Sequence, residues 1–271
     1  MAIIGCGYVG TAVARFWSQA GHQVTATTTR QEKVTTLQSI AQRVVVLRGN
    51  DEDALREVVN QQDMVLLSVG AADSNVYRET YLETAKNIVK ALKQSLSVQQ
   101  LIYTGSYAVL GDKDGAWTDE TSPVAPANEN GQILWETEQV LLAAQNEQLK
   151  VCILRLAGIY GKGRELIKIF GALAGTTRPK KGEDFTNWIH LDDIVGGLEC
   201  ARLKQLDGIY NLTCDEPLTA RELMDRLFEL HGLPSVSWDA STPPIRPYNS
   251  RLSNQKIKAV GFQLIHPEIL F

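Results

Sequence analysis

Short apolar runs alternate with stretches of helical periodicity along the first part of the chain. The apolar runs predict strands at residues 2–4, 22–28, 43–48, 64–69, 101–104 and 151–156. The periodic stretches predict helices at residues 8–20, 53–60, 74–96 and 133–144. Strands that are apolar throughout are typical of a parallel sheet with helices on both faces. The pattern therefore predicts an α/β fold built on a doubly wound parallel sheet.

The regular alternation loosens after residue 156. Residues 157–187 are rich in glycine, a helix is predicted at 191–202 and a strand at 209–213. Thr219 and Glu222 have the spacing of a capping box, which opens a helix that ends at Gly232. We expect the parallel sheet and its helices to form one domain at residues 1–156 and 188–213. Residues 157–187 and 214–271, including the proline-rich stretch 242–247, are expected to form a smaller substrate-binding lobe.

The composition is that of an ordinary globular protein, with 271 residues, 44% hydrophobic and 21% charged. A net charge of −4 argues against a nucleic-acid or anionic membrane partner. No apolar run approaches the roughly 18 residues of a membrane span, and the first strand begins at once, so we expect a cytoplasmic protein. The cysteines are scattered and the four histidines do not cluster in the sequence, which predicts no metal site.

A glycine-rich turn joins the first strand to the first helix. Gly5 permits a tight turn, Gly7 lets the backbone approach a pyrophosphate, and Gly10 lets the helix pack against the strand. Tyr8 and Val9 complete the turn, and the helix N-terminus offers N–H groups to phosphates. An inward helix face is predicted for Val9, Val13, Ala14 and Phe16. The motif predicts a Rossmann dinucleotide site, with a purely structural turn as the alternative.

The second strand ends in polar and basic residues instead of an acid. NAD-binding proteins place an acid near position 28, where it binds both ribose hydroxyls. Here Thr28 and Thr29 offer hydroxyl groups and Arg30 offers a guanidinium that suits a 2′-phosphate. The residues favour NADP(H), with NAD(H) as the alternative and a surface arginine as the non-functional interpretation.

Further cofactor contacts are expected at the ends of the next strands. Asn50 is placed to reach the adenine, and Asp53 is expected to cap the following helix. The small residues Ser68, Val69 and Gly70 leave room for the pyrophosphate and nicotinamide ribose, with a plain strand end as the alternative. Thr104, at the end of its strand, joins this set.

Four segments in order resemble the extended short-chain dehydrogenase/reductases, the group of nucleotide-sugar epimerases and dehydratases. They are residues 101–112 (LIYTGSYAVLGD), 155–163 (RLAGIYGKG), 188–194 (WIHLDDI) and 208–211 (GIYN). The resemblance implies that Ser106 is the catalytic serine, with a strand-end serine that bonds to local backbone as the alternative. It also implies that His190 and Asp193 hold the substrate loop to the core.

The proton-transfer pair of that family is absent. Alignment on Gly131 and Glu138 places Asn130 at the tyrosine position and Leu134 at the lysine position. Neither side chain can act as the usual acid, so the chain resembles atypical members of the group. Tyr107 and Tyr160 are the phenols considered as substitutes, although Tyr160 also fits a packing role.

Two functions remain open on the sequence. The first is an NADP(H)-dependent oxidoreductase or epimerase-like enzyme with a modified site, acting on a small polar substrate such as a sugar or nucleotide sugar. The second is a non-catalytic NADP(H)-binding sensor or regulatory protein, because the fold alone does not decide between them. Lys180 and Lys181 could meet a phosphorylated substrate or be solvated. The oligomeric state stays open, a homodimer being one option.

Overall fold

The computed structural model describes residues 1–179, 181–242 and 248–271. Lys180 and most of the proline-rich stretch therefore lie outside the described residues. The chain divides into two compact units. Unit 1 consists of Met1–Ser106, Asn128–Arg155 and Val195–Tyr210, and unit 2 of Tyr107–Ala127, Leu156–Ile194 and Asn211–Phe271.

A seven-stranded parallel sheet forms the centre of unit 1, in the order β12-β7-β5-β4-β1-β2-β3. Its strands are β1 (Ala2–Ile4), β2 (Thr25–Thr28), β3 (Arg43–Val46), β4 (Met64–Leu67), β5 (Gln100–Ser106), β7 (Lys150–Leu156) and β12 (Gly208–Leu212). The predicted doubly wound α/β fold is confirmed. The strand order reverses beside β1, which pairs with β2 on one side and β4 on the other. Open sheets of this kind bind ligands at the carboxyl ends of the strands near that reversal.

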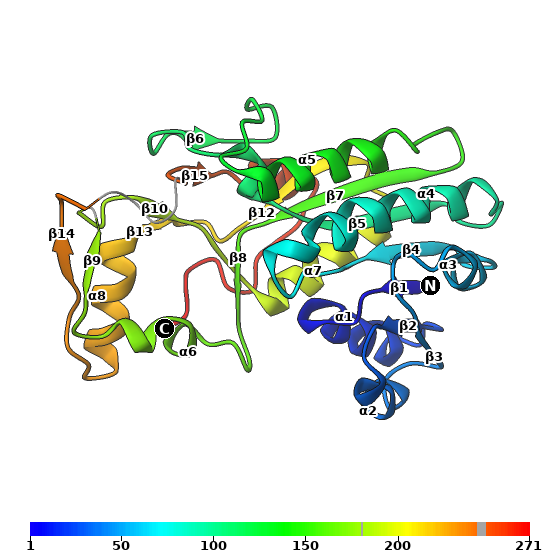
Figure 1. The fold of residues 1–271 in the computed structure, drawn as a ribbon, viewed down its shortest axis with the longest axis horizontal. Helices are drawn as coiled ribbons and strands as arrows, with labels where there is room; N and C mark the ends of the chain where they lie inside the picture. Colours follow the sequence, from blue (N-terminus) through cyan, green and yellow to red (C-terminus); the bar gives the residue numbers. More distant parts are fainter. Residues whose placement is uncertain (180, 243–247) are drawn as a thin grey trace. The chain divides into compact units, whose positions relative to one another are not determined.

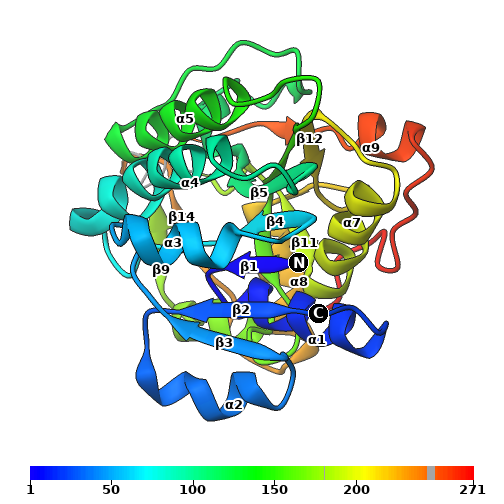
Figure 2. The same ribbon diagram turned by 90° about the vertical axis from the view of Figure 1, so that its right-hand side faces the viewer.

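Helices cover both faces of this sheet, as Figure 2 shows. One face carries α3 (Glu52–Val59), α4 (Thr84–Lys93) and α5 (Glu129–Leu142), and the other carries α1 (Tyr8–Gln19) and α7 (Leu191–Leu203). The short α2 (Val34–Gln38) packs beside β3. On the second face the indole Nε1 of Trp17 donates to the Glu199 carboxylate of α7 at 2.8 Å.

Two predictions for single residues of unit 1 are wrong. Phe16 is 40% exposed, and Trp17 is the fully buried aromatic residue of α1. Asp53 does not cap α3, because Asp51 is the N-cap residue and accepts the Ala54 N–H at 3.0 Å. Asp53 instead forms an ion pair with Arg56.

The single helix expected at residues 74–96 is divided. A 3-10 turn (Ser74–Val76) and a π-helical turn (Glu79–Glu83) precede α4. The Thr84 hydroxyl donates to the Glu79 carbonyl at 3.1 Å, five residues back, in keeping with the wider π turn.

Unit 2 is built from small sheets and short helices around its own core. Its strands form the pairs β8 (Gly158–Tyr160) with β11 (Trp188–His190), β9 (Thr177–Pro179) with β14 (Ser237–Asp239), β10 (Phe185–Thr186) with β13 (Leu218–Thr219), and β6 (Trp117–Thr118) with β15 (Arg251–Leu252). Its helices are α6 (Leu166–Phe170), α8 (Ala220–Leu230) and α9 (Gln255–Ala259). Figure 1 shows α8 beside β9 and β14.

The capping box predicted for unit 2 is confirmed. The Thr219 side chain accepts the Glu222 N–H, and the Glu222 carboxylate accepts the Thr219 N–H at 2.9 Å. The inner face of α8 packs Leu223, Leu227 and Phe228 into the core of this unit. Among the described residues of the whole chain, no helix has the length and apolar character that a membrane crossing requires.

Candidate functional site

The glycine turn between β1 and α1 is tightly packed on its inner side. Gly5 has φ +98°, and a Cβ there would lie 2.6 Å from the carbonyl oxygen of Ser68. A Cβ on Gly10 would lie 2.4 Å from the Gly5 carbonyl oxygen. The turn is also tied to β2, because the Gly5 N–H donates to the Thr27 hydroxyl at 3.0 Å and the Cys6 N–H to the Thr27 carbonyl at 2.8 Å. Close packing therefore explains Gly10, and close packing together with a positive φ explains Gly5.

Gly7 differs from its two neighbours in the motif. A Cβ on Gly7 would have no atom within 4 Å and would point into open space. Gly7 is the N-cap residue of α1, which has no acidic residue in its first turn and, within the described residues, no side-chain cap. Such a helix end presents N–H groups and a partial positive charge to an anion. Packing therefore does not account for this glycine, and the expectation that it lies under a pyrophosphate stays a prediction.

Basic side chains gather where β2 ends. The Thr28 hydroxyl accepts the Arg30 N–H at 3.2 Å, and Thr29 is exposed. The Arg30 guanidinium is 60% exposed and lies 3.9 Å from the Glu32 carboxylate. Sequence reasoning missed Lys33, whose ammonium donates to the Cys6 carbonyl in the glycine turn at 3.4 Å. Partial burial and the positive charge of Arg30 lower the pKa of Lys33. The only signal in the sequence was a second basic residue three positions after Arg30.

Small residues at the ends of β4 and β5 form a connected polar group. The Thr104 hydroxyl lies 3.2 Å from the Ser68 hydroxyl, and both residues are buried. Val69 follows Ser68, and a Cβ on Gly70 would have no atom within 4 Å. The structure thus brings Ser68 and Thr104 together beside Gly5, at the carboxyl edge of the sheet.

Asn50 lies after β3 at the same edge. Its amide donates to the Glu79 carboxylate at 3.4 Å, and the Asn87 amide donates to the neighbouring Gly49 carbonyl at 2.9 Å. The side chain is exposed, so an adenine contact for Asn50 stays a prediction.

The helix that should carry the proton-transfer pair packs against β5. Glu138 is fully buried and accepts hydrogen bonds from Arg155, whose Nη2 lies 2.7 Å from Oε2 and whose Nε lies 3.0 Å from Oε1 and 3.3 Å from Oε2. A Cβ on Gly105, next to Ser106, would lie 3.4 Å from the Glu138 carboxylate. Since residues 130, 134 and 138 share one helix face, this contact directs that face toward β5. Leu134 is also buried there, and Asn130 is half-buried.

The candidate phenols have different surroundings. Tyr107 opens the 3-10 turn Tyr107–Leu110. Tyr160 is 2% exposed, and its hydroxyl accepts the Leu270 N–H at 3.0 Å. Burial raises the pKa of Tyr160 to about 12, which favours the packing interpretation over proton donation. Sequence reasoning missed Tyr81, whose hydroxyl accepts the Ala71 N–H at 3.4 Å just after Gly70.

Cys6 and two of the histidines have different surroundings. Burial raises the pKa of the Cys6 thiol to about 11, so it stays protonated near neutral pH. The expectation that the histidines do not cluster is wrong for His190 and His266, whose ring centroids lie 4.1 Å apart. Asp193 is buried and accepts the N–H groups of Ile265 and His266 at 2.5 and 3.1 Å.

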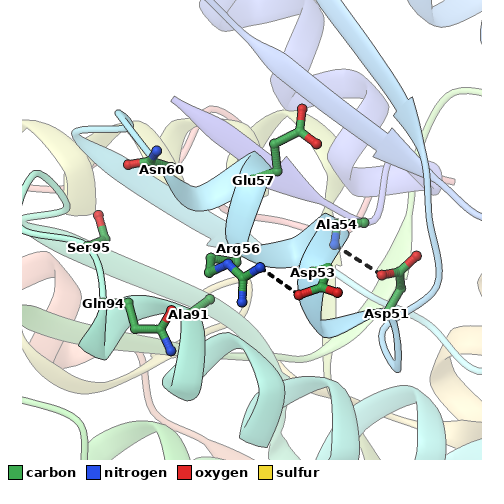
Figure 3. A pocket seen from close by; sticks show the side chains of 9 residues that line it. All are labelled: Asp51, Asp53, Ala54, Arg56, Glu57, Asn60, Ala91, Gln94 and Ser95. Carbon is green, nitrogen blue, oxygen red and sulfur yellow. Dashed lines mark hydrogen bonds and ion pairs between the residues drawn. The ribbon is translucent and has the colours of Figure 1, made fainter.

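A surface hollow of about 760 Å³ lies along α3 and α4 (Figure 3). Its lining includes the carboxylates of Asp51, Asp53 and Glu57, which disfavour a diphosphate. Figure 3 shows Asp51 bound to the Ala54 N–H and Asp53 paired with Arg56, so these two acids serve the helix itself. None of the glycine-turn residues lines this hollow.

Comparison with known proteins identifies the family. Residues 1–212 match the model of the NAD-dependent epimerase/dehydratase family. The chain belongs to this family. Protein YeeZ of Escherichia coli K12 is 31% identical over 283 residues, which cover 100% of this chain and 97% of YeeZ. The resemblance to the extended short-chain dehydrogenase/reductases is thereby confirmed.

Solved structures of the same fold are similar over nearly the whole chain. A functionally unknown conserved protein from Silicibacter pomeroyi has a TM-score of 0.78 and 25% identity, covering 98% of this chain and 94% of that one. A double mutant of the dTDP-glucose 4,6-dehydratase DesIV from Streptomyces venezuelae, solved with NAD bound, has a TM-score of 0.82 and 21% identity. That match covers 100% of this chain and 93% of DesIV, and it supports the fold alone.

Proposed function

We propose that this member of the family is an NADP(H)-dependent oxidoreductase or epimerase-like enzyme with a modified active site. Its substrate would be a small polar molecule such as a sugar or a nucleotide sugar. One structural neighbour, DesIV, is a dTDP-glucose 4,6-dehydratase. The observation that carries the proposal is Gly7, whose Cβ position faces open space at an uncapped helix end while Gly5 and Gly10 are explained by packing.

The residues present fit a dinucleotide. The first turn of α1 would hold the pyrophosphate, with Gly7 allowing close approach. The nicotinamide ribose would lie against Ser68, Gly70 and Thr104. When bound, NADP(H) supplies hydride transfer at the nicotinamide C4.

Preference for NADP(H) rests on the charges at the end of β2. Arg30 and Lys33 together would bind a 2′-phosphate, and no acid stands at position 28 to bind the ribose hydroxyls of NAD(H). Each charge-assisted hydrogen bond is worth about 1.5–3 kcal/mol, or roughly ten- to a hundredfold in affinity. Glu32 opposes this effect only weakly, since it is exposed and lies 3.9 Å from Arg30.

The chemistry would be carried out without the usual tyrosine and lysine. Ser106, at the end of β5, would bind the substrate carbonyl or hydroxyl group, with Asn130 on the facing side of α5. Tyr107 is the phenol nearest to Ser106 in the sequence and would supply the proton. General acid–base catalysis is worth about 10²–10⁴-fold, so ordinary nucleotide sugars should turn over slowly.

A non-catalytic NADP(H) sensor is the second candidate. The buried Leu134 favours it, because an apolar side chain at the lysine position can neither bind ribose hydroxyls nor lower the pKa of a neighbouring phenol. Steady consumption of NADPH with any carbonyl substrate would exclude the sensor.

The cofactor assignment is tested by titrating the protein with NADPH and NADH and recording ligand fluorescence. NADPH should bind at least tenfold more tightly, and Arg30→Ala should remove most of that difference. Arg43→Ala is the matched control. Arg43 is an exposed arginine that is paired with Glu57, and it lies at the amino end of β3, whereas Arg30 follows the carboxyl end of the neighbouring β2. Equal affinity for both nucleotides, unchanged in Arg30→Ala, would refute the NADP(H) preference.

A further inference from the structure

Two histidines and a carboxylate from separate segments meet within unit 2. His190 ends β11, Asp192 lies in the first turn of α7, and His266 belongs to the C-terminal segment after α9. The Asp192 Oδ2 lies 3.5 Å from Nδ1 of His190 and 3.4 Å from Nε2 of His266. One ligand atom from each residue lies within 4.8 Å of the others.

These distances match the edges of a metal coordination polyhedron. Zinc lies about 2.0–2.2 Å from imidazole nitrogen and carboxylate oxygen, which makes the edge of a tetrahedral site about 3.4 Å. Two of the three edges already have this length. Two imidazole nitrogens and one carboxylate favour a first-row transition metal over Mg²⁺ or Ca²⁺, which prefer oxygen ligands.

The surrounding contacts hold the C-terminal segment in place. Asp193 is buried and accepts the N–H groups of Ile265 and His266, which fixes the backbone that carries one ligand. The Tyr160 ring packs edge-on against His190 at 5.1 Å, and its hydroxyl accepts the Leu270 N–H. Such outer contacts orient metal ligands and limit the entropy lost on binding.

We propose that His190, Asp192 and His266 form a binding site for one divalent transition metal ion, with Zn²⁺ as the ligand of best fit. Asp192 is 60% exposed, so water would complete the coordination shell from the open side. His190 Nδ1 accepts a hydrogen bond from the Asp192 N–H at 3.2 Å. A bond from Nδ1 to the metal would take the place of this hydrogen bond. The ion would join the C-terminal segment to the junction of β11 and α7.

The test uses full-length protein freed of metal by EDTA and dialysis. Titration with Zn²⁺ followed by calorimetry should show one equivalent per chain, and Co²⁺ should give visible absorption bands of a nitrogen- and oxygen-ligated site. His266→Gln and Asp192→Asn should each weaken Zn²⁺ binding at least tenfold. His231→Gln is the matched control, because His231 is an exposed histidine of the same unit, and it should change affinity less than twofold.

Thermal unfolding gives a second measurement that does not depend on activity. Zn²⁺ should raise the melting temperature of the unmodified protein by several degrees, and EDTA should reverse the shift, since a ligand that binds only the folded state stabilises it. Asp192→Asn changes an exposed side chain and should fold normally while losing this shift. Absence of a one-to-one complex, or equal Zn²⁺ affinity in His266→Gln and the unmodified protein, would overturn the proposal and leave a hydrogen-bonded histidine cluster.

Discussion

Substituting two glycines of the same motif should separate ligand binding from packing. Gly7→Ala places a methyl group in open space, whereas Gly10→Ala places one 2.4 Å from the Gly5 carbonyl oxygen. We expect Gly7→Ala to lower the free energy of unfolding by less than about 1 kcal/mol, because the added methyl group meets no atom within 4 Å and only the N-cap preference of glycine over alanine is lost. It should nevertheless weaken NADPH binding strongly.

The size of the binding loss follows from the contacts a pyrophosphate would make. A methyl group on Gly7 would hold the phosphates away from the first turn of α1. Losing two charge-assisted hydrogen bonds of about 1.5–3 kcal/mol each costs about 3–6 kcal/mol, or roughly 10²–10⁴-fold in affinity. Gly10→Ala should instead lower stability, since overpacking costs about 1–3 kcal/mol and the better helix propensity of alanine returns at most about 1 kcal/mol.

Urea denaturation and NADPH titration on the same samples separate the effect of each substitution on stability from its effect on cofactor binding. Gly7→Ala should unfold at nearly the urea concentration of the unmodified protein yet fail to bind NADPH in the micromolar range. Gly10→Ala should unfold at a lower concentration. If folded Gly7→Ala binds NADPH as tightly as the unmodified protein, the glycine turn is structural and the cofactor assignment fails.

Two further predictions concern the end of β5 and the helix beside it. If Ser106 acts in catalysis in place of the usual tyrosine and lysine, Asn130→Ala should still consume NADPH with an active substrate. Ser106→Ala should lower that rate at least tenfold. Equal rates in the two variants would contradict a catalytic role for Ser106. Glu138→Gln should lower the free energy of unfolding by about 3–5 kcal/mol, because the buried Arg155 loses its charged partner. The exposed pair of Arg43 with Glu57 provides the control: Glu57→Gln should cost less than about 1 kcal/mol, and similar urea midpoints for the two variants would contradict this account.

The sequence by itself determined the elements whose signals are local. The glycine turn, the apolar parallel strands and the capping box at Thr219 each depend on residues a few positions apart, and all three are present in the structure. The family resemblance could also be recognised from short motifs. Gly5 has a backbone conformation that favours glycine, and Thr219 caps its own helix. Such features depend on neighbouring residues and little on contacts with distant parts of the chain.

Tertiary structure decided which side chains meet. Phe16 and Trp17 are adjacent aromatic residues on one amphipathic helix, and the contact of Trp17 with Glu199 of α7 selects the one that is buried. The same holds for Lys33 beside the glycine turn and for His190 beside His266. Periodicity sets the repeat of a helix or strand, but the rotation of that element against the sheet, and the contacts between remote segments, depend on how the whole unit packs.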